Sequence, residues 1–535
     1  MIKLVKNFKR IAAAFTAIAL AAAFASCAAD DDIPAALIES APPVETTAAP
    51  DIKVPSGPAA INTFGVAWSA SDSLCPMITS SRLNLELAWL LYEGLFELTE
   101  DGQAEAVLCE SVTRDGNIWS FTVKEGVVFS DGEPLTASDV VYSLELAMAT
   151  GSNYASRLAC IASVRETGEY TLEITTKTEM GRLELLLNVP VIKADTGNLN
   201  APVGSGLYVL ATVDGESSLK TSPYRRGETS INSIELVDTP EAELLLSGFE
   251  LGSICVVSSD PTATDALVYS GDYEAWDYAT TNMCYLGFNT RSGVMADAEL
   301  RRLFASAVDR ETICRQDMEG YAEAVTVPFS PRSAIYEEAG LELLSRPIEE
   351  VAEELSELGW SDLDGDGWLE KASGRSESEL AVRFVVCDEN SYKAAVARRI
   401  AEEWRLIGIN VELSELSWSD YLSALSSRNF DVYFGEIKLR ADFDITSLVG
   451  SGGALNYGGY SSTETDELLA AYIAADEYTA ADAAAALCED LEENVPVSPV
   501  FFKCGLFLAR RGELSNVEPI AGNIYNNVEI WRDSE

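Results

Sequence analysis

Histidine is absent from all 535 residues of the chain. This absence excludes Ser-His and Cys-His catalysis and removes the side chain that most often binds transition metals. The ten cysteines stand singly, without a C-x-x-C pair, so the spacing of a zinc ribbon is also missing. Nine remain when Cys27 is set aside, and several have apolar neighbours, as in Leu108-Cys109 and Ile254-Cys255. The sequence therefore predicts buried free thiols rather than a disulfide framework.

Basic side chains are scarce, with 37 Lys and Arg against 86 Asp and Glu and a formal net charge of -49. So acidic a surface repels polyphosphate, which argues against nucleic acid as a partner and against a basic membrane-binding face. Solubility is the simplest reason for this charge. A chain of 535 residues exceeds what one hydrophobic core usually serves, so we expect two or three lobes.

The N-terminal apolar run, residues 11–25, is shorter than the about 20 apolar residues that a membrane-spanning helix needs. It follows four basic side chains, and this order is typical of a secretory signal peptide, which we place at residues 1–26. Phe24-Ala25-Ser26-Cys27 resembles a lipoprotein processing box, in which Cys27 becomes the lipidated first residue. The alternative is an ordinary signal peptide with an incidental cysteine.

Residues 27–58 hold six prolines among Ala, Thr, Asp and Glu. This composition predicts a lipidated, disordered or extended tether. Such a tether would let a folded body stand away from the outer face of the cytoplasmic membrane, which is the periplasm if the cell has an outer membrane.

The stretch from Trp119 to Leu144 has the clearest local punctuation in the chain. Trp119, Phe121 and Val123 alternate with polar residues, which predicts a half-buried strand. A turn follows, and then Thr136 and Asp139 have the spacing of a helix capping box. On physical grounds alone this stretch is a folding unit, because patterned apolar residues are usually core.

Three further segments have helical or strand periodicity. Residues 84–96 and 392–406 carry apolar side chains at helical spacing, and residues 409–413 alternate as a strand. A helix followed by such a strand favours an α/β lobe.

Asp362, Asp364 and Asp366 alternate ahead of Gly367, as at the start of an EF-hand-like calcium loop. The Glu expected at position twelve is instead Ser373. We keep two interpretations, a calcium turn and a turn without a metal, and we expect no other cofactor.

The motif from Trp119 to Leu144, W-S-F-T-V-K-E-G-V-V-F-S-D-G-E-P-L-T-A-S-D-V-V-Y-S-L in this chain, resembles the signature of the extracytoplasmic solute-binding proteins of peptide/nickel-type ABC transporters, solute-binding protein family 5. The resemblance continues in order from about Asn84 to Phe502. Its further segments are Tyr92–Phe96, Pro202–Tyr208, Tyr285–Thr290, Leu300–Arg310 and Trp418–Asp444.

The resemblance implies an α/β, two-lobed periplasmic-binding-protein-like fold of type II, cluster C, with an extra subdomain. It places lobe I at 59–100, 202–285 and 496–535, the extra subdomain at 101–201, and lobe II at 286–495.

In peptide-binding members of the family, an Asp pairs with the peptide ammonium, a Trp lines a side-chain pocket and the strand near a Gly bonds the peptide backbone. Carried over by position, these roles fall on Asp442, Trp418 and Gly435. Asn456 and Tyr457 are further candidates for the cleft. A carboxylate that faces an ammonium group makes a charge-assisted hydrogen bond. Strand addition recognises the backbone of a peptide, whatever its side chains are.

This chain departs from the family pattern around the same residues. Glu436 replaces the usual Trp, 437–440 lengthens the connection, and Ile445 replaces a Pro. Asp444 is therefore an alternative to Asp442 as the ammonium anchor. Simpler interpretations are a surface helix-cap role for Asp442 and a core position for Trp418.

The resemblance implies a monomeric, non-enzymatic lipoprotein that captures peptides by hinge closure and delivers them to a membrane permease with its ATPases. One alternative is a non-peptide solute such as a glycan, an opine or a metal chelate. A secreted hydrolase that uses a carboxylate pair is a second alternative, although the sequence shows no such local pair. A purely structural surface lipoprotein is a third.

Overall fold

The computed structural model describes residues 64–224, 229–264, 266–269, 271–343, 346–373 and 376–531. The predicted signal peptide, Cys27 and the tether lie outside these residues, so those expectations stay predictions. Within the described residues, none of the helices is both long and apolar enough to cross a membrane.

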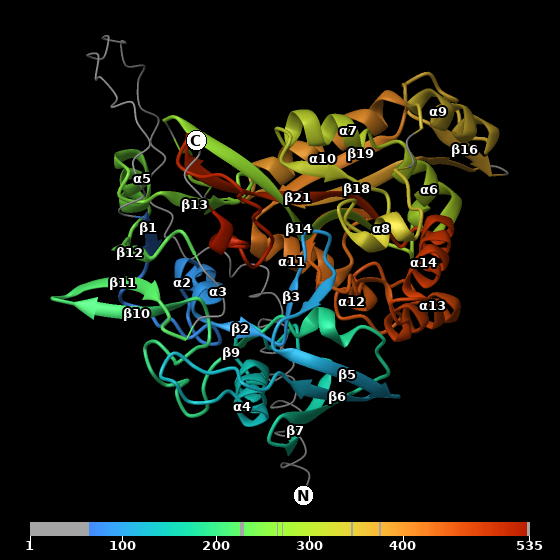
Figure 1. The fold of residues 1–535 in the computed structure, drawn as a ribbon. Helices are drawn as coiled ribbons and strands as arrows, with labels where there is room; N and C mark the ends of the chain where they lie inside the picture. The colour runs from blue at the N-terminus through green and yellow to red at the C-terminus, as the bar shows by residue number, and fades with distance from the viewer. Residues whose placement is uncertain are drawn as a thin grey trace, which may run out of the picture.

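Two long antiparallel strands, β14 (Tyr273–Phe288) and β21 (Val497–Arg510), run through the middle of an eleven-stranded sheet. Their pairing shifts register between Ala279 and Met283 of β14. Before this shift β21 is flanked by β13, and after it β14 is flanked by β20. We call the part on the β13 side lobe I and the part on the β20 side lobe II, and Figure 1 shows both strands passing between them.

Lobe I is built on strands that lie parallel at its centre, with β1 between β12 and β13. All five residues of β1 are buried, as expected of a strand covered on both faces. The elements of lobe I are β1 (Phe64–Trp68), α2 (Arg82–Glu86), α3 (Ala88–Leu91), β10 (Tyr208–Val213), β11 (Glu216–Thr221), β12 (Ser233–Asp238), α5 (Ala242–Leu251) and β13 (Val256–Ser259).

The helix predicted at 84–96 is wrong in its second half. Helix α3 ends at Leu91, and Tyr92 has extended backbone angles. Gly94 lies in a short strand, where a Cβ atom would come within 2.8 Å of the Phe96 carbonyl oxygen. The apolar spacing was helical, but close backbone packing at Gly94 requires an extended chain.

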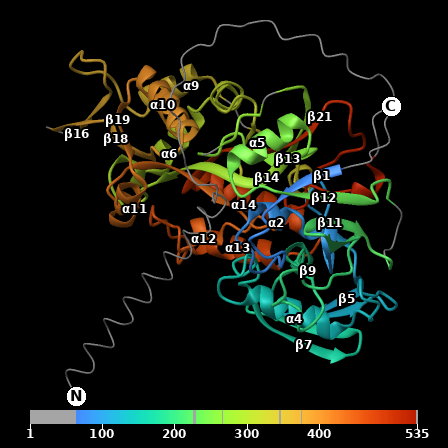
Figure 2. The ribbon, with the colours of Figure 1, turned by 90° about the vertical axis from the view of Figure 1, so that its left-hand side faces the viewer.

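The extra subdomain is a four-stranded antiparallel sheet, ordered β5-β6-β8-β7, with α4 against it. The predicted strand is β6, and the predicted capping box is present, since the Thr136 amide donates to Asp139 Oδ2 at 2.9 Å. Figures 1 and 2 show the subdomain beside lobe I. Its elements and the short strands that join it to lobe I are β2 (Glu93–Gly94), β3 (Phe96–Leu98), β4 (Ala104–Ala106), β5 (Cys109–Asp115), β6 (Ile118–Val123), α4 (Ala137–Met148), β7 (Ile161–Gly168), β8 (Thr171–Thr176), η1 (Leu183–Leu186) and β9 (Pro190–Val191).

Lobe II places β20 between β14 and β18, with β19 at the edge of the sheet. The helix predicted at 392–406 is α10, and the strand predicted after it is β19. The helices and turns of lobe II are η2 (Val294–Ala296), α6 (Ala298–Ser306), α7 (Arg310–Thr312), η3 (Ile313–Asp317), α8 (Ala334–Glu338), α9 (Ile348–Glu357), α10 (Ser391–Leu406), α11 (Trp418–Ser427), α12 (Thr446–Val449), α13 (Thr463–Ala474) and α14 (Ala480–Asn494). Its strands are β15 (Ala322–Ala324), β16 (Glu370–Ser373), β17 (Ser376–Glu379), β18 (Ala381–Cys387), β19 (Asn410–Leu416) and β20 (Val432–Lys438), and η4 (Val528–Ile530) lies near the end of the chain.

The apolar core is divided unevenly. One cluster runs through lobe I and the extra subdomain together, from Phe64 to Phe121 and on to Trp531. Lobe II has two clusters of its own, one around Trp404 of α10 and the other around Tyr433 of β20. The sheet of lobe II is therefore packed on both faces.

All nine cysteines among the described residues are free thiols, and most of them are buried. The prediction of buried free thiols is confirmed for this part of the chain. Burial raises the pKa of these thiols, to about 11 at Cys109 and well above the ordinary value at Cys284.

Candidate functional site

Gly435 lies in β20 opposite Tyr285 of β14. A Cβ atom at Gly435 would lie 2.8 Å from Cζ of the Tyr285 ring, so the glycine makes room for this ring. The ring of Tyr285 meets Tyr433 edge-on, with centroids 5.8 Å apart. Beyond Tyr433, β20 pairs with β14 alone among the described strands, because β18 pairs with β20 only through Val432 and Tyr433. Gly435 is thus part of a strand whose second edge has no strand partner there.

Trp418 and Tyr457 lie around the same aromatic cluster. Trp418 is half-buried at the start of α11, and its ring stacks on Tyr421 with centroids 6.0 Å apart. Tyr421 in turn donates its hydroxyl to the Phe434 carbonyl of β20 at 2.8 Å. Tyr457 meets Tyr433 edge-on at 6.1 Å. The structure thus brings Gly435, Trp418 and Tyr457 together around β20.

Asn456 uses its side chain within its own loop. Its Nδ2 donates to the Gly450 and Tyr460 carbonyls at 2.9 and 2.8 Å, and its Oδ1 accepts from the Tyr460 amide at 3.0 Å. This pattern holds the loop that presents Tyr457. The geometry supports a positioning role for Asn456.

Asp442 is buried, with 3% of its surface exposed, and faces Arg440. The guanidinium donates from Nε to Oδ1 at 3.1 Å and from Nη2 to Oδ2 at 2.7 Å, and Nη2 also reaches Asp444 Oδ2 at 2.8 Å. Burial raises the pKa of Asp442, and Arg440 opposes that rise. Both predicted ammonium anchors are therefore bound to a cation that the chain itself supplies.

The Asp442 cluster lies where lobe II meets the extra subdomain. The Tyr472 hydroxyl of α13 donates to the Asp442 carbonyl at 2.8 Å, and the Arg182 guanidinium stands 4.7 Å from the centroid of the Tyr472 ring. The Gly181 amide donates to the Ile473 carbonyl at 2.8 Å. Asp442 thus belongs to a polar group on the subdomain side of the apolar cluster that contains Tyr433 and Tyr472.

A third group of charges begins at Glu436, next to Gly435 in β20. Glu436 is ion-paired with Lys393 of α10, and Lys503 Nζ of β21 lies 3.5 Å from its Oε1. Burial alone would raise the pKa of Glu436, but the two ammonium groups hold it at about 2. Glu436 is therefore ionised throughout the physiological range.

Sequence reasoning assigned no role to Arg440, Glu436 or Lys503. A partial signal exists for Arg440, because an R-x-D-x-D spacing lets one guanidinium reach two carboxylates in a short loop. No comparable signal exists for Lys503, because its partners lie 67 and 243 residues away.

The acidic turn of the calcium prediction uses its carboxylates to fold its own backbone. Asp362 accepts from the Gly365 and Gly367 amides at 2.7 and 3.1 Å, and Asp366 accepts from the Trp368 amide at 2.9 Å. Oxygens of Asp362, Asp364 and Glu370 lie within 4.8 Å of one another, so Glu370 takes the place expected for Asp366. Calcium binding at this turn stays a prediction.

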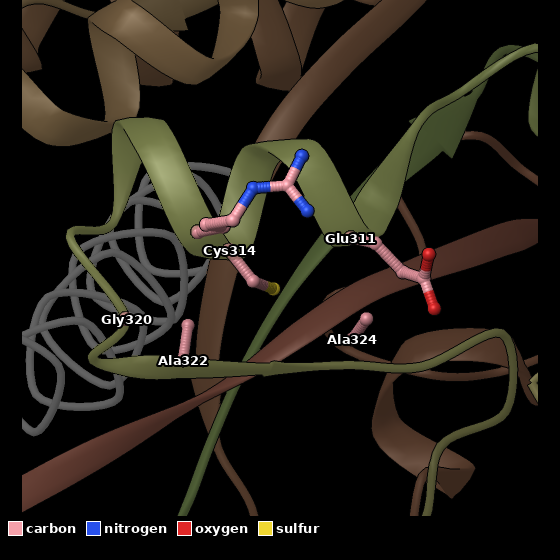
Figure 3. Close-up of a pocket in the computed structure, with 6 residues that line it drawn as sticks. Glu311, Cys314, Gly320, Ala322 and Ala324 are labelled. Atoms are coloured by element: carbon pink, nitrogen blue, oxygen red, sulfur yellow. The ribbon is translucent and has the colours of Figure 1, made fainter.

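A recess of about 440 Å³ lies beside η3 and β15 in lobe II. Figure 3 shows the Cys314 thiol directed toward the strand that carries Ala322 and Ala324. The residues that line it are Glu311, Cys314, Arg315, Gly320, Ala322 and Ala324. None of the predicted ligand residues lines this recess.

Two lobes joined by long strands that both lobes share, with a subdomain packed on the first lobe, define a two-lobed solute-binding protein. The model of the bacterial extracellular solute-binding proteins, family 5 (Middle), matches residues 103–452, and the chain belongs to this family.

Relatives and solved structures agree with this assignment. The oligopeptide-binding protein AppA of Bacillus subtilis is 24% identical over 408 residues, which cover 71% of this chain and 74% of that protein. The structure of AppA from Bacillus subtilis in complex with a nonapeptide has a TM-score of 0.58 at 20% identity, covering 89% of this chain and 99% of that one. The nickel ABC transporter from Bacillus halodurans has a TM-score of 0.71 at 20% identity, covering 87% and 98%. The predicted two-lobed α/β fold is confirmed.

Proposed function

We propose that this protein captures peptides between lobe I and lobe II and delivers them to the permease of an ABC transporter. The observation that supports a peptide most directly is the edge of β20 beyond Tyr433, which has no second strand partner among the described residues. An extended peptide can add to such an edge through its backbone, whatever its side chains. The relatives named as peptide-binding proteins favour the same class of ligand.

Closure of the lobes supplies the mechanism. β14 and β21 connect the lobes, and residues 280–282 of β14 have no register partner in β21. A short break in a ladder of hydrogen bonds is a place where backbone angles can change. A solute that contacts both lobes stabilises the closed state by its differential affinity for that state.

The remaining parts of the proposal concern the cell surface. Removal of a signal peptide at residues 1–26 and lipidation of Cys27 would anchor the protein outside the cytoplasmic membrane as a monomer. Mass spectrometry of the membrane-extracted protein tests this directly. A mature N-terminus other than acylated Cys27 would contradict the anchor and leave the solute proposal intact.

A thermal-shift screen tests the solute class. Peptides of two to nine residues, glycans, opines and nickel chelates are added separately to the full chain without its signal peptide. A peptide ligand at about 100 times its Kd should add about 2.7 kcal/mol to the free energy of unfolding. No shift with any peptide, together with a shift from a glycan, an opine or a chelate, would favour the non-peptide alternative.

The Asp442→Asn variant tests the role of Asp442 separately from the class of solute. If Asp442 anchors a ligand ammonium, the variant should weaken binding of a free peptide but not of its N-acetylated form. Equal affinities of variant and wild type for the free peptide would remove that role. They would also leave the bond to Arg440 as the function of Asp442.

A further inference from the structure

Four charged side chains alternate in sign across the junction of the two lobes. Lys503 Nζ lies 2.5 Å from Asp260 Oδ2 and 3.5 Å from Glu436 Oε1, and Glu436 is ion-paired with Lys393. Asp260 follows β13 of lobe I, whereas Glu436 and Lys393 belong to β20 and α10 of lobe II. Lys503 stands on β21, which passes between the lobes. The row therefore crosses from one lobe to the other through a single ammonium group.

A second polar contact joins the same two surfaces. The Asn390 side chain caps α10 by accepting from the Lys393 amide at 2.9 Å, and its Nδ2 donates to the Thr262 carbonyl of lobe I at 2.9 Å. Thr262 is itself held by Asp260, whose Oδ1 accepts from its amide at 3.0 Å. The first turn of α10 and residues 260–262 are thus fixed to each other by groups that face one another across the junction.

Burial makes this row sensitive to the loss of one member. Lys503 has only 5% of its surface exposed, and an ion pair so placed stabilises the fold only while both partners are present. Without the ammonium group, the carboxylates of Asp260 and Glu436 would face each other from opposite lobes. Two carboxylates that both lie beside the position of one ammonium group repel each other, and the repulsion is relieved when the lobes move apart.

We propose that Lys503 is an ionic latch, which holds lobe I against lobe II by pairing with Asp260 on one side and Glu436 on the other. The inference rests on the two-lobed fold and is independent of the class of solute. It would therefore survive failure of the peptide proposal.

Small-angle X-ray scattering and amide hydrogen exchange of the Lys503→Met variant test the latch. Methionine keeps an unbranched side chain and lacks the terminal ammonium group, so the charge is lost. We expect a larger radius of gyration than in the wild type. We also expect amide exchange at Asp260, at Thr262 and in the first turn of α10 to be at least about fivefold faster, which is the low end of coupling between sites. Addition of Glu436→Gln to this variant removes one of the facing carboxylates and should reverse part of the opening.

Two further variants make the result decisive. Asp260→Asn removes the lobe I partner without leaving two carboxylates together, so it should open the lobes less than Lys503→Met, and it decides the matter if Lys503→Met fails to fold. Arg398→Met breaks an ion pair within lobe II, where Arg398 Nε lies 2.7 Å from Glu415 Oε1, and should change neither measurement. Scattering and exchange that match the wild type in folded Asp260→Asn and Lys503→Met would overturn the latch.

Discussion

Lobe I meets its two neighbours in different ways. Its contact with the extra subdomain is part of one apolar cluster, in which Phe96 of the joining strand β3 packs edge-on against Phe121 of the subdomain, with ring centroids 6.2 Å apart. Its contact with lobe II at the shared strands also includes charged pairs, through Lys503 on one side and through Arg332 on another, where the Arg332 guanidinium pairs with Asp277 and Glu323.

The difference indicates which joint moves. Separating an apolar joint exposes apolar surface to water, at a free-energy cost of about 25 cal/mol per Å² of that surface. Lobe I and the subdomain should therefore move as one body. Parting an ionic joint lets water solvate the separated charges, which offsets much of the lost attraction. We therefore expect the joint with the subdomain to be the more rigid one and the joint with lobe II to be the one that opens.

The largest expected effect is on the apolar joint. Phe121→Ala removes a buried ring and should lower the free energy of unfolding by about 3 to 5 kcal/mol, as is usual for a core phenylalanine. Chemical denaturation measures this loss. The radius of gyration of the folded variant should equal that of the wild type, and a larger value would contradict the view that this joint is rigid.

Acid should weaken the ionic joint selectively. The pKa of Glu436 in the folded protein is about 2, below the ordinary 4.5, so its contribution is present above pH 4.5 and is lost as the pH falls toward 2. Between pH 6 and pH 3 this group alone should remove about 2 kcal/mol from the free energy of unfolding.

Glu436→Gln lacks this titration, so the difference in stability between wild type and variant should narrow by that amount over the same range. Denaturant curves at pH 6, 4 and 3 measure the difference. A difference that stays constant with pH would show that Glu436 is not held ionised by its lysines.

Glu403 lies within lobe II rather than at a joint, and its effect on stability should depend on pH in the opposite sense to that of Glu436. Burial raises the pKa of Glu403 to about 7, although the Asp309 amide donates to its carboxylate. A raised pKa means that the stability present below pH 4.5 is lost as the pH rises through 7. Because Glu403 is partly exposed, we expect only part of the full effect. Glu403→Gln should raise the free energy of unfolding by about 1 to 2 kcal/mol at pH 8 and by almost nothing at pH 5. Melting temperatures at the two pH values test this, and an equal change at both would contradict it.

The smallest effect is expected at a surface ion pair. Arg398→Ala should change the free energy of unfolding by less than about 1 kcal/mol, because exposed pairs contribute little. The same denaturation assay provides the value. This pair lies within lobe II, away from the junction. A loss of stability as large as that of Phe121→Ala would therefore show that an ion pair need not lie between the lobes to have a large effect.

The sequence predicted local structure well where neighbours in the chain decide it. The capping box of Thr136 and Asp139 and the helix that became α10 depend on spacings of three and four residues. The helix predicted at 84–96 was wrong after Leu91, because contacts with distant segments override local periodicity there.

The candidate site was harder to predict because its character depends on partners far apart in the chain. The family resemblance named Trp418, Gly435 and Tyr457, and the structure places all three around β20, while their roles toward a ligand stay predictions. The pairing of Asp442 with Arg440 changes what that carboxylate can bind, and side-chain geometry was needed to see it. The partners of Lys503 come from segments whose proximity only the folded sheet reveals.

The nine free thiols have a chemical consequence of their own. Thiolate is the reactive form of cysteine, and burial raises the pKa of thiols such as Cys255, Cys284 and Cys488, so these sulfurs are both covered and protonated at neutral pH. The described part of the molecule should therefore resist oxidation in an oxidising compartment without forming disulfides. A cysteine introduced on its surface should react with a maleimide dye far faster than any of the native nine.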